Sequence, residues 1–136
     1  MRTNPNPGHG AQEPRLIVDA RAEVGEGPLW DDRRGLLWWV DIVAGLVHRT
    51  DPATGRDEAL ALGQPVGAVA LREQGGLLAC LADGIARLDP ETGTIEPFAP
   101  LPDRPGIRMN DAKVGPDGRL WCETMEMDGA AGLGAL

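Results

Sequence analysis

The sequence predicts an all-β protein built from a repeated antiparallel unit, and three observations indicate this fold class. The 136 residues include 19 Gly and 12 Pro, a composition typical of many turns between short strands. The apolar runs are strand-sized, and none keeps a 3.6-residue period over the length of an ordinary helix. The pattern of runs and turns also recurs along the chain, with a period of about 41 residues.

The chain begins with a polar segment and continues with short apolar runs. Residues 1–14 contain too few apolar side chains to offset the cost of ordering, so we expect a disordered tail. The domain is then expected over residues 15–136, where turns rich in Gly, Pro and Asp separate the runs. The predicted strands are 16–18, 28–30, 36–42, 46–49, 59–62, 66–71, 77–82, 85–88, 95–98, 112–114 and 120–125.

Two sequence patterns repeat. The letters GLLW at 35–38 correspond to GLLA at 76–79 and GRLW at 118–121, at spacings of 41 and 42 residues. DPATG at 51–55 corresponds to DPETG at 89–93, and this pattern suits a hairpin turn because Asp and Pro begin a turn and Gly adopts positive φ. A unit of four short strands with this period has the size of one β-propeller blade, although Gly-rich hairpins can also recur by coincidence.

About three such units fit into residues 15–136, whereas propellers have roughly four to eight blades. A ring with so few blades would leave long unpaired edges. We therefore expect an incomplete N-terminal portion of about two and a half to three blades of a longer propeller, or a chain that pairs with another chain.

Charge and composition exclude several partners. Thirteen Lys and Arg against 21 Asp and Glu give a net charge of −8, which disfavours nucleic acid. No apolar run approaches the length of a membrane span, and the N-terminus lacks the apolar run of a signal peptide. Two cysteines do not make a disulfide framework, so we expect a cytoplasmic protein with buried free thiols at Cys80 and Cys122.

The turn GEGP at 25–28 places the carboxylate of Glu26 between two glycines, which leave room for other groups to approach it. This arrangement suits a hard divalent cation bound through oxygen, although a solvated turn glutamate has the same pattern. The segment 108–113 (RMNDAK) is a second candidate, because the Arg108 and Asn110 side chains on one strand face can hold hydroxyl, carbonyl or carboxylate groups. The alternative is a surface strand with an Arg–Asp pair.

Other chemical groups are less informative. Three acidic side chains between residues 122 and 129 (Glu123, Glu126 and Asp128) are compatible with a solvated loop. His48 has no His or Cys at a spacing that would form a zinc site, so we expect a structural role.

These same motifs resemble the opening of the sugar lactonase family, which includes gluconolactonase and regucalcin. The resemblance is carried by GEGPLW at 25–30, LWWVDI at 37–42, VGAVAL at 66–71 and, most specifically, RMNDAKV at 108–114 with PDGRLW at 116–121 and TM at 124–125. It runs from about residue 16 to residue 136 and implies a six-bladed propeller with one divalent cation in its central channel.

The resemblance also implies roles for individual residues. Glu26 corresponds to a metal ligand, whereas Arg108, Asn110 and Asp128 correspond to residues that contact the sugar lactone. The remaining metal ligands, one of which is the expected general acid/base Asp, would lie beyond Leu136. Ala112 and Glu123 stand where the family usually has glycine, and Glu123 could lie near the site or turn away from it.

The resemblance therefore implies metal-dependent hydrolysis of a sugar lactone to the sugar acid, with Ca²⁺, Zn²⁺, Mg²⁺ or Mn²⁺ as the cation. The fragment by itself is expected to be inactive, with no catalytic residue of its own. The alternatives are a truncated, non-catalytic fragment and a propeller that only binds other molecules. Every interpretation as a lactonase requires the side chains of Glu26, Arg108 and Asn110 to face the same axial cavity.

Overall fold

The computed structural model describes residues 13–101, 105–130 and 132–136, and within them it contains ten β-strands and no helix. Most of the predicted disordered tail, residues 1–12, lies outside the described residues. Within the described part of the chain, no helix is long and apolar enough to cross a membrane. The strands are β1 (Gly25–Asp31), β2 (Leu36–Asp41), β3 (Leu46–Asp51), β4 (Arg56–Ala61), β5 (Val66–Leu71), β6 (Leu77–Leu81), β7 (Gly84–Leu88), β8 (Ile95–Pro100), β9 (Ile107–Val114) and β10 (Leu120–Glu126).

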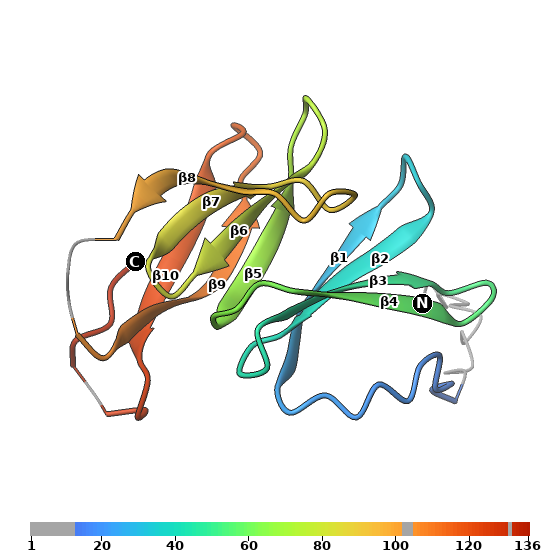
Figure 1. Ribbon diagram of the computed structural model, residues 1–136, viewed down its shortest axis with the longest axis horizontal. Coiled ribbons are helices and arrows are strands. Elements are labelled where there is room, and N and C mark those ends of the chain that lie inside the picture. Colours follow the sequence, from blue (N-terminus) through green and yellow to red (C-terminus); the bar gives the residue numbers. More distant parts are fainter. Residues whose placement is uncertain (1–12, 102–104, 131) are drawn as a thin grey trace, which may run out of the picture.

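The strands form three antiparallel sheets in chain order. The first sheet has the order β1-β2-β3-β4, the second β5-β6-β7-β8, and the third contains β9 and β10. Figure 1 shows the first two sheets inclined to each other, with β9 and β10 beside the second sheet. The predicted four-stranded unit is therefore confirmed twice, and a third unit is present as its first two strands.

The repeated turn of residues 51–55 and 89–93 has the same structure in both units. The carboxylate of Asp51 accepts a hydrogen bond from the N–H of Ala53 at 2.8 Å, and that of Asp89 accepts one from Glu91 at 2.9 Å. Gly55 and Gly93 both have φ of 74°, in the left-handed region that glycine adopts most easily. This recurring chemistry explains why the sequence repeat predicts the turn between the third and fourth strands.

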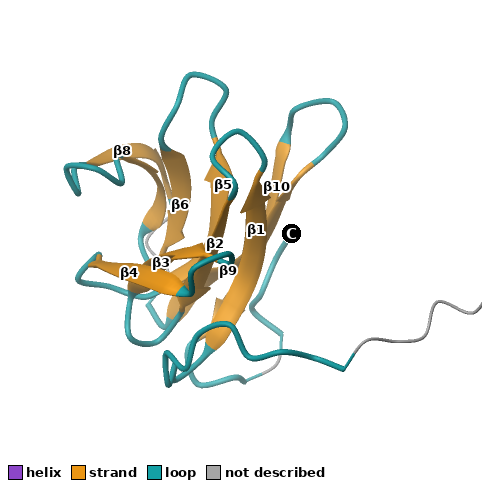
Figure 2. Cartoon of the chain, turned by 90° about the vertical axis from the view of Figure 1, so that its right-hand side faces the viewer, coloured by secondary structure: helices purple, strands orange, loops and turns teal. Residues whose placement is uncertain are grey.

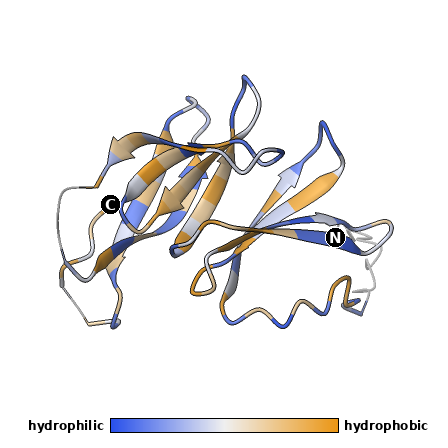
Figure 3. Ribbon diagram, in the orientation of Figure 1, coloured by the Kyte–Doolittle hydropathy of each residue, from blue (hydrophilic) through white to orange (hydrophobic). Residues whose placement is uncertain are grey.

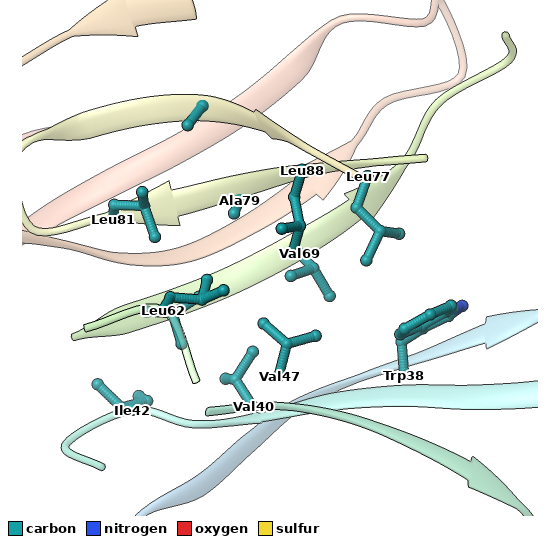
Figure 4. Close-up of a cluster of buried hydrophobic side chains, with 12 residues drawn as sticks. Trp38, Val40, Ile42, Val47, Leu62, Val69, Leu77, Ala79, Leu81 and Leu88 are labelled. Carbon is teal, nitrogen blue, oxygen red and sulfur yellow. The ribbon is translucent and has the colours of Figure 1, made fainter. Parts of the chain in front are cut away.

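The main hydrophobic core lies between the first and second sheets (Figure 4). Its side chains come from both sheets, and the largest is Trp38, which is only 2% exposed. Figure 3 shows hydrophobic residues along β5 in the middle of the molecule and hydrophilic residues in the turn between β1 and β2. A smaller core between the second and third sheets contains Ala68, Cys80, Met109 and Ala112.

The first strand of each sheet lies next to the first strand of the following sheet. β5 contacts β1 and β2, and β9 contacts β5 and β6. β1 and β5 therefore lie side by side, as both ribbon views show (Figures 1 and 2). Sheets that meet along their first strands in this way have the arrangement of successive propeller blades.

One predicted strand is absent. Residues 16–18 have no strand structure, and Leu16 is 77% exposed. A run of three apolar residues forms a strand only when a sheet edge pairs with it, and this segment instead lines a hollow on the first sheet.

Candidate functional site

A backbone irregularity interrupts the first strand of every sheet at an equivalent place. In β1 two residues, Gly27 and Pro28, lie opposite one residue of β2. In β5 the extra residue is Gly67, and in β9 Asn110 and Asp111 lie opposite the single residue Glu123 of β10. Such β-bulges redirect side chains and are common next to active sites.

Glycine at position 67 allows the irregular segments of β5 and β9 to approach each other closely. A Cβ atom added at Gly67 would lie 2.1 Å from the carbonyl oxygen of Asn110, so only glycine fits there. A Cβ atom added at Gly27 would lie 3.8 Å from the carbonyl oxygen of Gly67. The backbone next to Glu26 therefore lies beside Gly67 of β5, and Gly67 is also the residue that lies against Asn110 of β9.

Glu26 is exposed near the start of β1, where it pairs with Val40 of β2. Its carboxylate forms no hydrogen bond or ion pair with any described residue. It lines a hollow of about 390 Å³ together with Trp39, Thr50 and residues 15–18, whereas Arg108 and Asn110 do not line this hollow. A free carboxylate next to glycine can bind a hard cation, and the shared cavity with Arg108 stays a prediction.

Arg108 and Asn110 form a direct contact on β9. The Nη1 atom of Arg108 donates to the Oδ1 atom of Asn110 at 3.2 Å and to the carbonyl oxygen of Met109 at 2.9 Å. Its Nη2 atom contacts the Sδ atom of Met125, across the strand pair, at 3.0 Å. Burial lowers the pKa of Arg108 from its ordinary value, because the charged guanidinium loses solvent.

Glu123 belongs to the same cluster. Its Oε1 atom accepts a hydrogen bond from the Nδ2 atom of Asn110 at 2.7 Å. The bulge causes this contact, because it places Asn110 and Asp111 together opposite Glu123. Of the two orientations left open by the sequence, the side chain adopts the one near Asn110, and both polar atoms of the Asn110 amide are therefore engaged.

The alternative of an Arg–Asp surface pair is not observed on β9. Asp111 is exposed and forms its ion pair with Lys113, at 3.5 Å, and accepts a hydrogen bond from the N–H of Ala112. No carboxylate of a described residue lies within ion-pair distance of Arg108.

Comparison with known proteins identifies the family. A sequence profile described as the SMP-30/gluconolactonase/LRE-like region matches residues 24–136. The chain belongs to this family.

Several relatives are similar over most of this chain. A 6-deoxy-6-sulfogluconolactonase of Pseudomonas putida is 38% identical over 112 residues, covering 82% of this chain and 38% of the relative. Regucalcin of Xenopus laevis is 34% identical, with coverage of 82% and 38%. The chain thus spans less than two-fifths of the length of these relatives.

Two solved structures of related proteins have the same fold over the shared region. The calcium-binding protein regucalcin of Agrobacterium tumefaciens has a TM-score of 0.79 at 34% identity, covering 83% of this chain and 39% of that protein. A gluconolactonase of Xanthomonas campestris has a TM-score of 0.60 at 26% identity, covering 75% of this chain and 35% of that protein.

In this SMP-30/gluconolactonase-like chain, Asp128 forms no hydrogen bond or ion pair with Arg108, Asn110 or Glu123. It is exposed in the turn after β10, where its Oδ1 atom accepts a hydrogen bond from the N–H of Ala130 at 3.0 Å. The structure brings together Arg108 and Asn110 but gives Asp128 no contact with either. Its role in binding substrate stays a prediction.

A buried carboxylate fixes the segment that leads into the GEGP turn of this family member. Asp41, 3% exposed, accepts hydrogen bonds from the N–H groups of Glu23 at 2.8 Å and Val24 at 2.9 Å. Burial by itself raises the pKa of Asp41, but hydrogen bonds from Val24, Glu23 and Ala44 and the nearby His48 outweigh it, and the net pKa lies below 3.8. No motif in the sequence indicates this role for Asp41.

We expect Asp41→Asn to lower the free energy of unfolding by about 2 kcal/mol at neutral pH, because its NH₂ group would face an N–H donor. The folded-state pKa is depressed, so this stabilisation is present above 3.8 and is lost as pH falls through the lower folded value. Urea unfolding followed by tryptophan fluorescence, at neutral pH and near pH 3, measures both effects. A difference between Asp41→Asn and the unsubstituted chain that stays constant across this range would contradict the assignment.

A second buried polar network lies on the first sheet and includes His48, for which the sequence predicts a structural role. His48 stacks on Trp39 with ring centroids 3.7 Å apart, and its Nδ1 atom lies 2.7 Å from the carboxylate of Asp57. Thr50 links Trp39 to Asp57 by accepting from the indole N–H and donating to the carboxylate. The cross-strand pairs Trp39–His48 and Thr50–Asp57 carry the network, but the sequence shows such pairs only after the register is known.

The two cysteines pack in the core between the second and third sheets, at equivalent positions of successive sheets. Cys80 is 1% exposed, and burial first, then the nearby Cys122 and Asp111, raise its pKa to about 12. Cys80 is therefore a protonated, buried thiol, as the sequence predicted, whereas Cys122 is partly exposed.

Proposed function

We propose that this chain is the N-terminal portion of a metal-dependent sugar lactonase with a six-bladed propeller fold. The relatives named lactonase and gluconolactonase support a hydrolase that opens a sugar lactone ring to the sugar acid. The chain spans less than two-fifths of the length of these relatives, so we extend lactonase activity to this chain only as a proposal.

One observation carries the proposal: the bulged first strands of the three sheets adjoin at Gly27, Gly67 and Asn110. This adjacency supports a single site, lined by inner strands, between Glu26 on β1 and the Arg108–Asn110 pair on β9. The interaction of Arg108 with Asn110 also supports a positioning role, since a guanidinium and an amide together offer several donors to sugar hydroxyl groups.

Glu26 fits the role of a cation ligand, because its carboxylate is exposed and has no partner among described residues. No group of three or more His, Cys, Asp or Glu side chains within the described part could hold a metal, so further ligands would come from elsewhere. A bound divalent cation would supply Lewis-acid stabilisation of the negative charge that develops on the carbonyl oxygen. A relative described as a calcium-binding protein favours Ca²⁺ among the candidates Ca²⁺, Zn²⁺, Mg²⁺ and Mn²⁺.

The residues of this chain would bind and orient the substrate. Arg108 holds its positive charge in a partly buried position, where it can hydrogen-bond to ring hydroxyls or to the carbonyl group. We place the general acid/base outside this chain and expect the 136 residues by themselves to bind ligands without hydrolysing them. This is also the alternative function, a binding module without turnover.

The test uses Mn²⁺, which broadens NMR signals of nearby nuclei. We expect Mn²⁺ to broaden the amide signals of Gly27, Gly67 and Asn110 in the 136-residue chain, because Gly27 follows Glu26, Gly67 adjoins Gly27, and Asn110 adjoins Gly67. Glu26→Gln should abolish this broadening, because it removes the anionic ligand, whereas Glu73→Gln, at an exposed position between β5 and β6, should leave it unchanged. Broadening centred elsewhere, or equal in Glu26→Gln, would refute the metal site.

A further inference from the structure

Glu123 adds a negative charge directly to the proposed substrate face. Its carboxylate is half-buried on β10 and is held 2.7 Å from the Nδ2 atom of Asn110. On the other side of the same amide, Oδ1 accepts from Arg108. Arg108, Asn110 and Glu123 thus form a continuous chain of hydrogen bonds from a cation through an amide to an anion.

The positive charge of Arg108 has no direct ion-pair partner in the described part of the chain. No carboxylate of a described residue lies within ion-pair distance of this guanidinium, and its other contacts are the neutral Met109 carbonyl and Met125 sulfur. A partly buried arginine of this kind attracts phosphate, sulfate or carboxylate groups strongly. Glu123, one amide away, offsets that attraction and repels an anion that approaches the same face.

We propose that Glu123 is a specificity-determining residue that restricts the site to uncharged sugar rings. Its free carboxylate oxygen accepts a hydrogen bond from a ring hydroxyl, and its charge disfavours substrates that carry a phosphate, sulfate or carboxylate substituent. This inference rests on the proposed function, because it assumes that the Arg108–Asn110 face receives the sugar.

The probes are 1,5-anhydroglucitol and its 6-phosphate, two stable sugar rings that lack the bond to be hydrolysed. NMR titration of the 136-residue chain, followed at the Asn110 side-chain amide, gives the affinity for each. We expect the unsubstituted chain to bind the uncharged ring more tightly than its phosphate. Glu123→Gln should shift the ratio of the two affinities about tenfold towards the phosphate, the effect of removing one nearby unit charge from a partly exposed site.

Two further variants control the comparison. Glu96→Gln, at an exposed position of the outer strand β8 of the second sheet, removes the same charge from a different sheet and should leave the ratio unchanged. Glu123→Gly also removes the charge and introduces no amide group. It is expected to shift the affinity ratio in the same way, and it replaces Glu123→Gln in the experiment if Glu123→Gln folds poorly.

The outcomes separate this inference from the proposed function. If neither probe perturbs the Asn110 signal in any variant, the Arg108–Asn110 face does not bind the sugar ring, and both proposals are refuted. If the uncharged ring binds but the ratio does not change in the Glu123 variants, or changes equally in Glu96→Gln, only the role of Glu123 is refuted. Tighter binding of the phosphate by the unsubstituted chain refutes it as well.

Discussion

Gly67→Ala is expected to lower the free energy of unfolding by about 3 kcal/mol or more, the upper range for overpacking a close contact. The new Cβ atom would lie 2.1 Å from the carbonyl oxygen of Asn110 and 2.7 Å from its Cα atom. These are backbone atoms, so no side chain can rotate to relieve the clash, and β9 must move away from β5. Urea unfolding monitored by tryptophan fluorescence measures the change.

Gly35→Ala is the matched control for this substitution. Gly35 has φ of 66°, but a Cβ atom there would meet nothing within 4 Å. The control therefore reports backbone strain without a clash, which costs about 1 kcal/mol for a left-handed residue. If Gly67→Ala were as mild as Gly35→Ala, the close approach of β5 to β9 would be refuted.

The same substitution bears on the proposed site. Asn110 is held between β5 on one side and Glu123 on the other, so a displaced β9 also displaces the amide that joins Arg108 to Glu123. We therefore interpret Gly67 as a residue that sets the position of the substrate face. Gly67 acts only through its lack of a side chain, so no functional motif in the sequence identifies it.

Local chemistry explains why much of the fold could be predicted. The Asp and Gly residues of the turns at 51–55 and 89–93 determine the hairpins by themselves, and the sheet order follows from short connections between successive strands. The strand predicted at residues 16–18 is absent from the structure. A strand must pair with an available sheet edge, and three apolar residues do not specify such an edge.

The candidate site was only partly predictable, because the alternation of residues along a strand does not reveal where the strand contains a bulge. Arg108 and Asn110 share a strand face through simple alternation, and the structure confirms their contact. The position of Glu123 could not be derived, because alternation alone ignores the extra residue in β9 that brings Asn110 opposite it. Asp128 was assigned only by family resemblance, and no local geometry ties it to the Arg108 cluster.

Trp38→Ala is expected to cost about 4 kcal/mol, the usual loss when a buried tryptophan is truncated. Trp38 is 2% exposed in the core between the first two sheets, and its indole Nε1 atom donates to Asp31 at 3.4 Å. The guanidinium of Arg49 lies 5.9 Å from the ring centroid on the same sheet. All of these contacts are lost with the side chain, and the cavity that remains weakens the packing of the first sheet against the second.

Two controls and one functional readout test this interpretation of Trp38. Trp38→Phe keeps a ring in the core and should cost less, about 1–2 kcal/mol, whereas Trp30→Ala, at a side chain that is 51% exposed, should cost under about 1 kcal/mol. The first sheet carries Glu26, and its core with the second sheet fixes the distance between Glu26 and β9. In Trp38→Ala that remains folded at low temperature, Mn²⁺ should therefore broaden Gly27 but no longer Asn110. Broadening of both signals, as in the unsubstituted chain, would show that the core does not hold the two halves of the site together.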